Sequence, residues 1–205
     1  MQNASHTVRE ELWDIVIFIG VIWAVFFESL LFPSLDSFGV VPRKLIGLVG
    51  IPAAPFLHAR FFHLLGNTVP LFFLLALLAG SKARSFEIVI EIILLGGLVL
   101  WFFGRTGDHI GASGLIFGLI AFLILSGFLE KRVVPMIVAV VVGFSYGGTL
   151  LFGVLPTVGP QISWDGHLCS AIAGGIVAYD LTRDSRPREA AGKVLKTEDD
   201  TVTSA

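Results

Sequence analysis

Charged residues are scarce in this chain, and cysteine is almost absent. Asp, Glu, Lys and Arg make up only 15% of the 205 residues, whereas a soluble domain typically carries about 25%. The single cysteine, Cys169, excludes an internal disulfide, so cysteine usage does not indicate a redox compartment. The net charge of −2 and the lack of a basic cluster argue against a nucleic-acid partner.

Apolar residues are abundant instead, at 55% of the chain with a mean hydropathy of +0.85. A helix needs about 20 mostly apolar residues to cross a bilayer. Six runs approach this length and predict an all-α, polytopic membrane protein. They cover residues 13–32, 58–80, 86–103, 113–129, 133–155 and 164–181. We therefore expect one six-helix membrane domain at 13–181, between a short N-terminal segment at 1–12 and a polar, disordered tail at 182–205.

The basic residues predict how this domain is oriented. With the N-terminus in the cytoplasm, ten of the 14 Lys and Arg residues fall on the inner side. An even number of spans then places both termini in the cytoplasm. The segment before the first run is acidic, with Glu10 and Glu11, which is not typical of a cleaved signal peptide. We expect the first run to remain as a span.

Polar residues interrupt three of the runs. Ser113 begins the fourth run within the segment 111–114, His63 and Asn67 lie in the second, and His167 lies near the start of the sixth. In the predicted topology all three runs point inward, so these side chains share one depth near the outer surface. The fourth run is only about 25 Å long at ~1.5 Å per residue. Ser113 is therefore expected below the outer surface, beside a wet cavity.

A serine hydroxyl beside an imidazole is the arrangement used in nucleophilic catalysis. Ser113 would attack a carbonyl, and His167 would accept its proton and later transfer it to the leaving amine. Unpaired N–H groups at the start of the fourth helix favour a negative charge there. His63 and Asn67, on one helix face, would donate to the same oxyanion. Phe117, one turn after the serine, is spaced to place an aromatic face near the base.

Small residues predict a close contact between the fourth and sixth runs. Gly114 and Gly118 lie on the fourth, and the sixth carries Ser170 and Gly174 among other small residues. Small side chains let helix backbones approach closely in lipid. This contact would bring the serine toward the base. Asp165 points to a different face of the sixth helix, so we predict a serine–histidine dyad without a third member.

These motifs resemble those of the rhomboid family of intramembrane serine proteases. Residues 111–114 match the family's G-x-S-G motif, and residues 63–67 match its H-x-x-x-N motif. His167 is followed seven residues later by Gly174, as in the family. The resemblance covers about residues 13–181, with the motifs in the second, fourth and sixth helices.

The resemblance implies the six-helix rhomboid fold and proteolysis by Ser113 and His167. It also implies that His63, Asn67 and the Ser113 N–H stabilise the oxyanion. The substrates would be transmembrane proteins in the lipid bilayer, cut at a site that opens to the extracytoplasmic side, without a cofactor or a metal ion. The oligomeric state stays open. Supporting roles are expected for Gly111, Gly114, Phe117, Gly174 and His58.

The chain departs from the family pattern at three places. The family commonly has tyrosine where Phe117 stands, so the stacking surface is kept and a hydroxyl is lost. Glycine is usual where Ser170 stands, so this serine adds volume at the close helix contact. The Trp-Arg pair that many members carry in the first outer loop is absent.

Other classes of function make different demands on the sequence. A catalytically silent rhomboid-like protein that binds membrane clients is the main alternative. A transporter or channel would need a charged path, for which only Glu87 and Glu91 are available. A zinc protease would need a motif such as H-E-x-x-H, which is missing. The G-x-S-x-G motif of soluble α/β-hydrolases is absent, because Leu115 stands where this motif has its final glycine.

Overall fold

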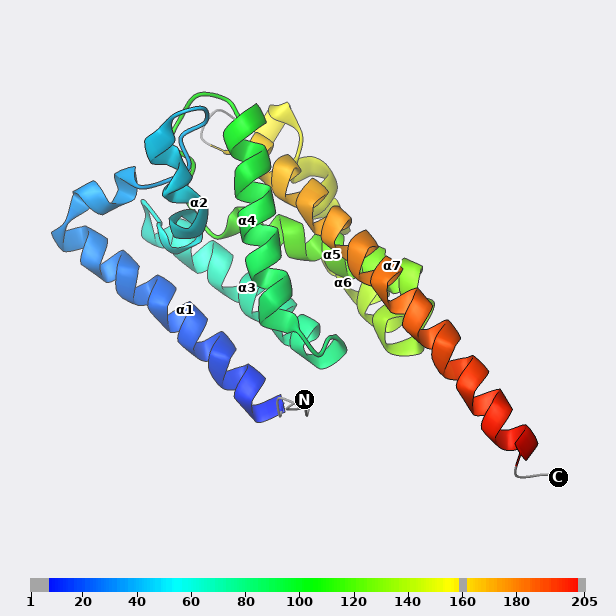
Figure 1. The fold of residues 1–205 in the computed structure, drawn as a ribbon. Helices are drawn as coiled ribbons and strands as arrows, with labels where there is room; N and C mark the ends of the chain where they lie inside the picture. The colour runs from blue at the N-terminus through cyan, green and yellow to red at the C-terminus, as the bar shows by residue number, and fades with distance from the viewer. Residues whose placement is uncertain (1–7, 159–161, 203–205) are drawn as a thin grey trace.

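The computed structural model describes residues 8–158 and 162–202, with side chains for 9–157 and 162–183. Within these residues six long helices dominate and no strand forms, so the all-α prediction is confirmed (Figure 1). The long helices are α1 (Val8–Leu31), α3 (Phe61–Ser81), α4 (Ser85–Phe103), α5 (Ser113–Glu130), α6 (Val133–Gly153) and α7 (Trp164–Val202). The short elements are α2 (Gly50–Ala53) and the 3-10 helices η1 (Pro33–Ser37), η2 (Leu45–Leu48), η3 (Ala54–Phe56) and η4 (Pro156–Val158).

Five helices in the described part of the chain are long and apolar enough to cross a membrane, namely α1, α3, α4, α5 and α6. Their bounds follow the first five predicted runs, with two larger differences at helix starts. α1 is already helical at Val8, the first described residue, and Glu10 and Glu11 lie in its first described turn, where acidic side chains are favourable. α3 begins at Phe61, after the extended backbone of Arg60.

α7 is not among these five, because its first turns carry the polar residues Asp165, His167 and Ser170. The helix continues through Val202, so residues 182–202 are helical where the sequence predicted a disordered tail at 182–205, and residues 203–205 lie outside the described part of the chain. Arg, Glu, Ala and Lys, which have high helix propensity, make up nine of these 21 residues, but Pro187 and Gly192 lie among them, so composition alone did not predict the helix.

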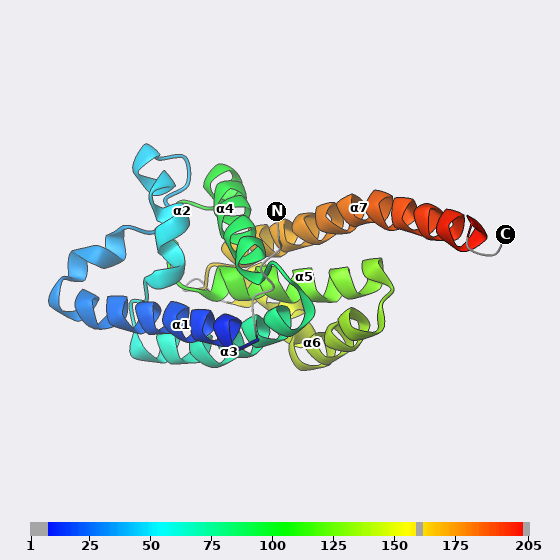
Figure 2. The same cartoon turned by 60° about the horizontal axis from the view of Figure 1, so that its bottom comes forward.

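α5 lies at the centre of the bundle, between α6 and α7 (Figure 2). In its most apolar stretch 56% of the residues are buried, against 22–33% in the other four candidate spans. The surrounding helices turn apolar side chains outward, and Phe62, Phe103 and Phe144 are each at least 80% exposed. Large apolar faces of this kind suit contact with lipid hydrocarbon rather than water.

The predicted close contact between the fourth and sixth apolar runs is present between α5 and α7. A Cβ on Gly174 would lie 2.0 Å from the Gly118 carbonyl oxygen, so the two backbones touch there. Ser170 fits beside this contact because two neighbouring positions lack side chains. A Cβ on Gly114 or on Gly96 of α4 would lie 3.0 or 2.9 Å from the Ser170 Oγ. The serine thus occupies space that these glycines leave open.

The connection between α1 and α3 folds over the ends of α4 and α5. Val40 and His109 exchange two backbone hydrogen bonds of 3.0 Å, one in each direction. The Arg43 guanidinium donates to the Gly104 carbonyl at 2.8 Å and to the Phe102 carbonyl at 3.3 Å. A cation at the C-terminal end of a helix is favourable. This connection is therefore held against the end of the bundle that carries Ser113.

Two ion pairs lie at the opposite end of the bundle. Lys82, after α3, forms an ion pair with Glu130 at the end of α5. Arg84 pairs with Glu87 in the first turn of α4. Both pairs lie at helix ends, so the charged groups stay at the edge of the apolar layer.

Candidate active site

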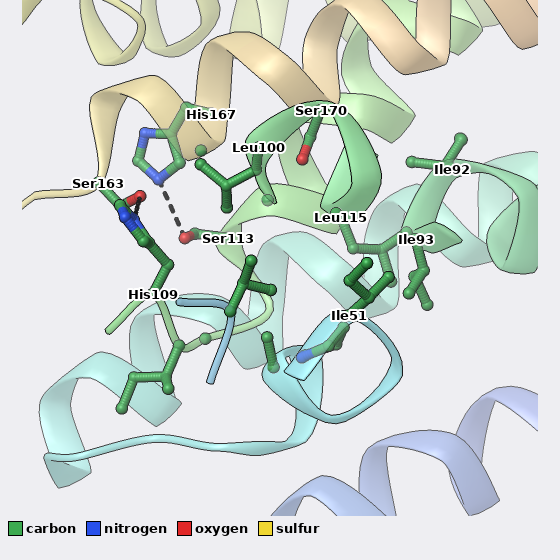
Figure 3. A pocket seen from close by; sticks show the side chains of 18 residues that line it. Ile51, Ile92, Ile93, Leu100, His109, Ser113, Leu115, Ser163, His167 and Ser170 are labelled. Atoms are coloured by element: carbon green, nitrogen blue, oxygen red, sulfur yellow. Dashed lines mark hydrogen bonds between the residues drawn. The ribbon is translucent and has the colours of Figure 1, made fainter. Parts of the chain in front are cut away.

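Ser113 and His167 come from two helices that pack against each other. Ser113 is the first residue of α5, and His167 lies in the first turn of α7. The Ser113 Oγ lies 2.9 Å from His167 Nε2 (Figure 3). The imidazole is buried, while the serine is partly accessible. The structure therefore brings together the two residues predicted as nucleophile and base.

The second ring nitrogen of His167 has a backbone partner that the sequence analysis missed. Its Nδ1 lies 2.9 Å from the carbonyl oxygen of Gly153, the last residue of α6. A carbonyl only accepts hydrogen bonds, so Nδ1 carries the proton in the neutral ring and Nε2 is left to accept from Ser113. The carbonyl thus takes the orienting position that a carboxylate holds in a triad. The sequence does not indicate which carbonyl will bond to His167, because every residue has a backbone carbonyl.

Phe117 lies flat against the base. Its ring and the His167 imidazole have centroids 4.0 Å apart and planes inclined by only 4°. Phe117 is one helical turn after Ser113 on α5, so the predicted aromatic face beside the base is confirmed. The stacked ring limits rotation of the imidazole out of the Ser113 hydrogen bond.

His63 and Asn67 face the turn that precedes the serine. Gly111 has φ +113°, a backbone conformation that residues with a side chain rarely adopt. A Cβ at this position would lie 2.6 Å from His63 Cε1 and 3.6 Å from Asn67 Nδ2. Ser113 holds the first position of α5, where a backbone N–H has no intrahelical acceptor. The three predicted donor groups therefore lie around one turn of backbone.

His58 supports this turn from the connection between α1 and α3. Its side chain is fully buried, and its Nε2 lies 3.0 Å from Asn67 Nδ2 and 3.3 Å from the Ala112 N–H. Burial lowers the pKa of His58 from 6.5 to about 4, so the ring is neutral at physiological pH and can accept these bonds. His58 therefore links Asn67 to the backbone beside Ser113, and its supporting role stays a prediction.

Asp165 takes no part in the serine–histidine pair. Its carboxylate accepts hydrogen bonds from the Arg105 backbone N–H at 2.7 Å and from the Arg105 guanidinium at 3.1 Å. It therefore faces away from His167, as its spacing along α7 predicted.

A cavity of about 50 Å³ lies beside Ser113 and His167. Apolar side chains form most of its wall, including Ile51 and Leu100, and Ser170 contributes a hydroxyl (Figure 3). One water molecule requires about 10–15 Å³ of such space, so the cavity has room for a few. Space for water is thus available next to the serine, as the predicted wet cavity requires.

An apolar helical bundle that encloses a hydrogen-bonded serine and histidine defines a class of multi-pass membrane protein. The family model of the Rhomboid domain matches residues 45–184, and the chain belongs to the rhomboid family. The match includes every predicted site residue, from His58 to Gly174.

Two mycobacterial proteins are similar over almost the whole chain. Uncharacterized protein Rv1337 of Mycobacterium tuberculosis is 40% identical over 201 residues, which cover 91% of this chain and 83% of the relative. Uncharacterized protein ML1171 of Mycobacterium leprae is 39% identical over 201 residues, covering 91% of this chain and 79% of the relative.

Proposed function

We propose that this protein is an intramembrane serine endopeptidase, with Ser113 as nucleophile and His167 as general base. The observation that carries the proposal is the 2.9 Å contact between the Ser113 Oγ and His167 Nε2. The bond from Nδ1 to the Gly153 carbonyl fixes the tautomer in which Nε2 is the acceptor. The serine proton therefore points at the base before a substrate binds.

The reaction follows from these positions. The Ser113 Oγ attacks the scissile carbonyl carbon while its proton moves to His167 Nε2, which produces a tetrahedral oxyanion. The oxyanion collapses, the amine leaves with the proton from Nε2, and an acyl ester remains on the serine. Water, deprotonated by the same nitrogen, then attacks the ester, releases the carboxylic acid product and restores the hydroxyl. The adjacent cavity has space for this water.

The oxyanion would be bound by the Ser113 N–H, His63 and Asn67. These groups surround the turn at Gly111, and the N-terminus of α5 adds a favourable dipole. An amide nitrogen carries two hydrogens, so the bond from Asn67 to His58 leaves one for the oxyanion. Each such donor typically contributes about 10²–10³-fold to kcat.

The proposal includes α7 as a sixth span. α7 packs along α5 through the Gly118–Gly174 contact, which gives both helices the same depth. Asp165 and His167 are buried against protein, and that is how polar side chains are tolerated within a membrane. With both termini in the cytoplasm, the site opens to the extracytoplasmic side, and reporter fusions after α3 and after α7 would both read as cytoplasmic.

The substrates would be transmembrane segments of other proteins. A peptide carbonyl within a helix is hydrogen-bonded and enclosed by side chains, so a helix must unwind locally to reach Ser113. Segments that contain Gly or Pro, which weaken helices, should be preferred.

Binding of membrane clients without cleavage is the alternative. Such a protein needs the fold and its lipid-facing surfaces, but it does not need a serine hydroxyl bonded to an oriented imidazole. Transport is less well supported, because Glu87 forms an ion pair with Arg84 at the start of α4 rather than part of a path across the bundle.

Labelling with a fluorophosphonate probe separates the enzyme from the silent binder. The purified protein should be labelled and should cleave a transmembrane substrate, and Ser113→Ala or His167→Ala should abolish both. Ser126→Ala is the matched control, because this buried serine of α5 donates only to the Leu123 carbonyl. Absence of labelling and cleavage in the wild-type protein would contradict the proposal and favour client binding.

A further inference from the structure

Four polar side chains outside the reacting pair join the two segments that precede Ser113 and His167. We call this set the polar clasp, and it consists of Arg105, His109, Ser163 and Asp165. Arg105 and His109 belong to the connection before α5, while Ser163 and Asp165 lie at the start of α7. We infer that the clasp sets the position of Ser113 against His167, with Arg105 and Asp165 as positioning residues. The inference rests on the proposed function of the pair.

The centre of the clasp is an ion pair whose carboxylate is buried and whose Arg105 side chain is 45% exposed. The Asp165 side chain is only 7% exposed, and each carboxylate oxygen accepts from Arg105. Oδ2 accepts from the backbone N–H at 2.7 Å, and Oδ1 from the guanidinium at 3.1 Å. The guanidinium also donates to the Ile162 carbonyl at 3.2 Å and lies 5.0 Å above the Trp164 ring. Arg105 is thereby held to Ile162, just before α7, and to Trp164 and Asp165 in its first turn.

His109 makes the second crossing between the segments. Its Nε2 lies 2.9 Å from the Arg105 carbonyl, and its Nδ1 lies 2.6 Å from the Ser163 Oγ (Figure 3). A carbonyl only accepts, so in the neutral ring Nε2 carries the proton and Nδ1 accepts from the serine hydroxyl. The backbone of His109 is also bonded in both directions to Val40. The clasp is therefore tied to the connection between α1 and α3 as well.

The clasp lies close to both Ser113 and His167 along the chain, so a change in it would alter the distance between them. Asp165 is two residues before His167, and His109 is four residues before Ser113. Beyond the clasp, α5 and α7 meet where a Cβ on Gly114 would lie 3.0 Å from the Ser170 Oγ, and their backbones touch further along, at Gly118 and Gly174. A displacement of about 1 Å between reacting groups can lower the rate about 10²-fold. Loss of the carboxylate charge would weaken both hydrogen bonds that Asp165 accepts from Arg105 and free this end of α7 to shift.

The test compares Asp165→Asn, Arg105→Gln and the double variant with the wild-type protein. For each, the rate of fluorophosphonate labelling, kcat and KM on one transmembrane substrate, and the apparent Tm in detergent are measured. We expect kcat and the labelling rate to fall about 10- to 100-fold, with KM within about 2-fold. The double variant should be no slower than the worse single variant, because both changes remove one interaction. Arg84→Gln is the matched control, since it breaks an exposed ion pair at the opposite end of the bundle.

A milder variant keeps the inference testable if Asp165→Asn or Arg105→Gln does not fold. Ser163→Ala removes only the hydroxyl bonded to His109, so its Tm should stay near the wild-type value while the labelling rate falls several-fold. Wild-type kinetics in Asp165→Asn and Ser163→Ala, or a change confined to KM, would overturn the inference. If wild-type Ser113 is not labelled at all, the proposed function fails and the inference fails with it. Normal wild-type labelling with unaffected variants would refute the inference alone.

Discussion

Phe117 and Gly153 are in direct contact, and both lie against the imidazole of His167. A Cβ on Gly153 would lie 2.2 Å from Cζ of the Phe117 ring, and that ring is stacked on His167. The carbonyl of the same glycine bonds to His167 Nδ1. The end of α6 and the aromatic ring of α5 therefore hold the imidazole together, one through its edge and the other through its face.

Replacing the aromatic ring should slow the reaction without destroying the site. Phe117→Leu keeps an apolar side chain but loses the stack, which is worth about 0.5–1.5 kcal/mol. We expect the labelling rate to fall about 2- to 12-fold, which is the same energy expressed as a rate. Single-turnover labelling of both proteins measures this change. A rate equal to that of the wild-type protein would show that the stack does not orient the base.

Adding a methyl group at the end of α6 should displace the ring. Gly153→Ala places a Cβ against Phe117, so either the aromatic ring or the helix end must move, and both movements disturb His167. We expect a fall of at least about 10-fold in the labelling rate. Gly147→Ala is the matched control on the same helix, because a Cβ there meets no atom within 4 Å. Equal rates in the two variants would contradict the prediction.

The contact between α5 and α7 offers a second matched pair. Gly174→Ala would push a Cβ to 2.0 Å from the Gly118 carbonyl oxygen, which forces the helices apart. Gly175→Ala meets only a Leu125 methyl at 3.7 Å, an ordinary contact. The first variant should lose both labelling and apparent Tm in detergent. The second should keep both, because alanine is favoured over glycine in a helix by about 1 kcal/mol. A stable and active Gly174→Ala protein would show that the spacing is not critical.

Removing a proposed oxyanion donor should lower kcat more than it raises KM. Asn67→Ala and His63→Ala each delete a group that would act mainly in the transition state, so we expect a loss of about 10²-fold in kcat. Steady-state cleavage of one transmembrane substrate separates the two constants. A rise in KM with kcat unchanged would assign these residues to substrate binding instead.

Stability should fall in acid because of His58, which lies in the connection ahead of α3. Its pKa is about 4 in the folded protein and 6.5 when unperturbed, so between these values the unfolded chain binds more protons. Folding therefore loses stability as the pH drops below about 6.5, by up to ~1.4 kcal/mol per pH unit. The loss levels off below about pH 4.

His58→Gln keeps an acceptor and removes the titrating ring. Its apparent Tm should be lower at neutral pH and should depend less on pH in this window. Thermal unfolding in detergent from pH 7.5 to pH 4 measures both curves. Parallel curves for the two proteins would mean that His58 does not cause the loss.

Much of the site could be predicted because its side chains are chemically distinctive. Ser113, His63, Asn67 and His167 are conspicuous because they are polar residues in otherwise apolar runs. Their positions within the runs predict that they lie at a similar depth near the outer surface. The predicted hydrogen bond between Ser113 and His167 is present. The runs predicted α1 and α3–α6 well, since hydropathy and length alone identify such helices. α7 was harder to delimit, because its start is polar and its polar second half, which includes Pro187 and Gly192, does not indicate a helix.

The sequence by itself determined that this chain is a bundle of apolar helices and which side chains meet near the start of α5. Apolar periodicity and rare polar residues are local properties, so they can be read without coordinates. Only the tertiary structure decided that the Gly153 carbonyl orients His167, that Asp165 pairs with Arg105, and that Gly96 makes room for Ser170. Each of these depends on the distance between separate helices or loops. The sequence does not indicate which group will approach a given backbone carbonyl or fill the space beside a given glycine.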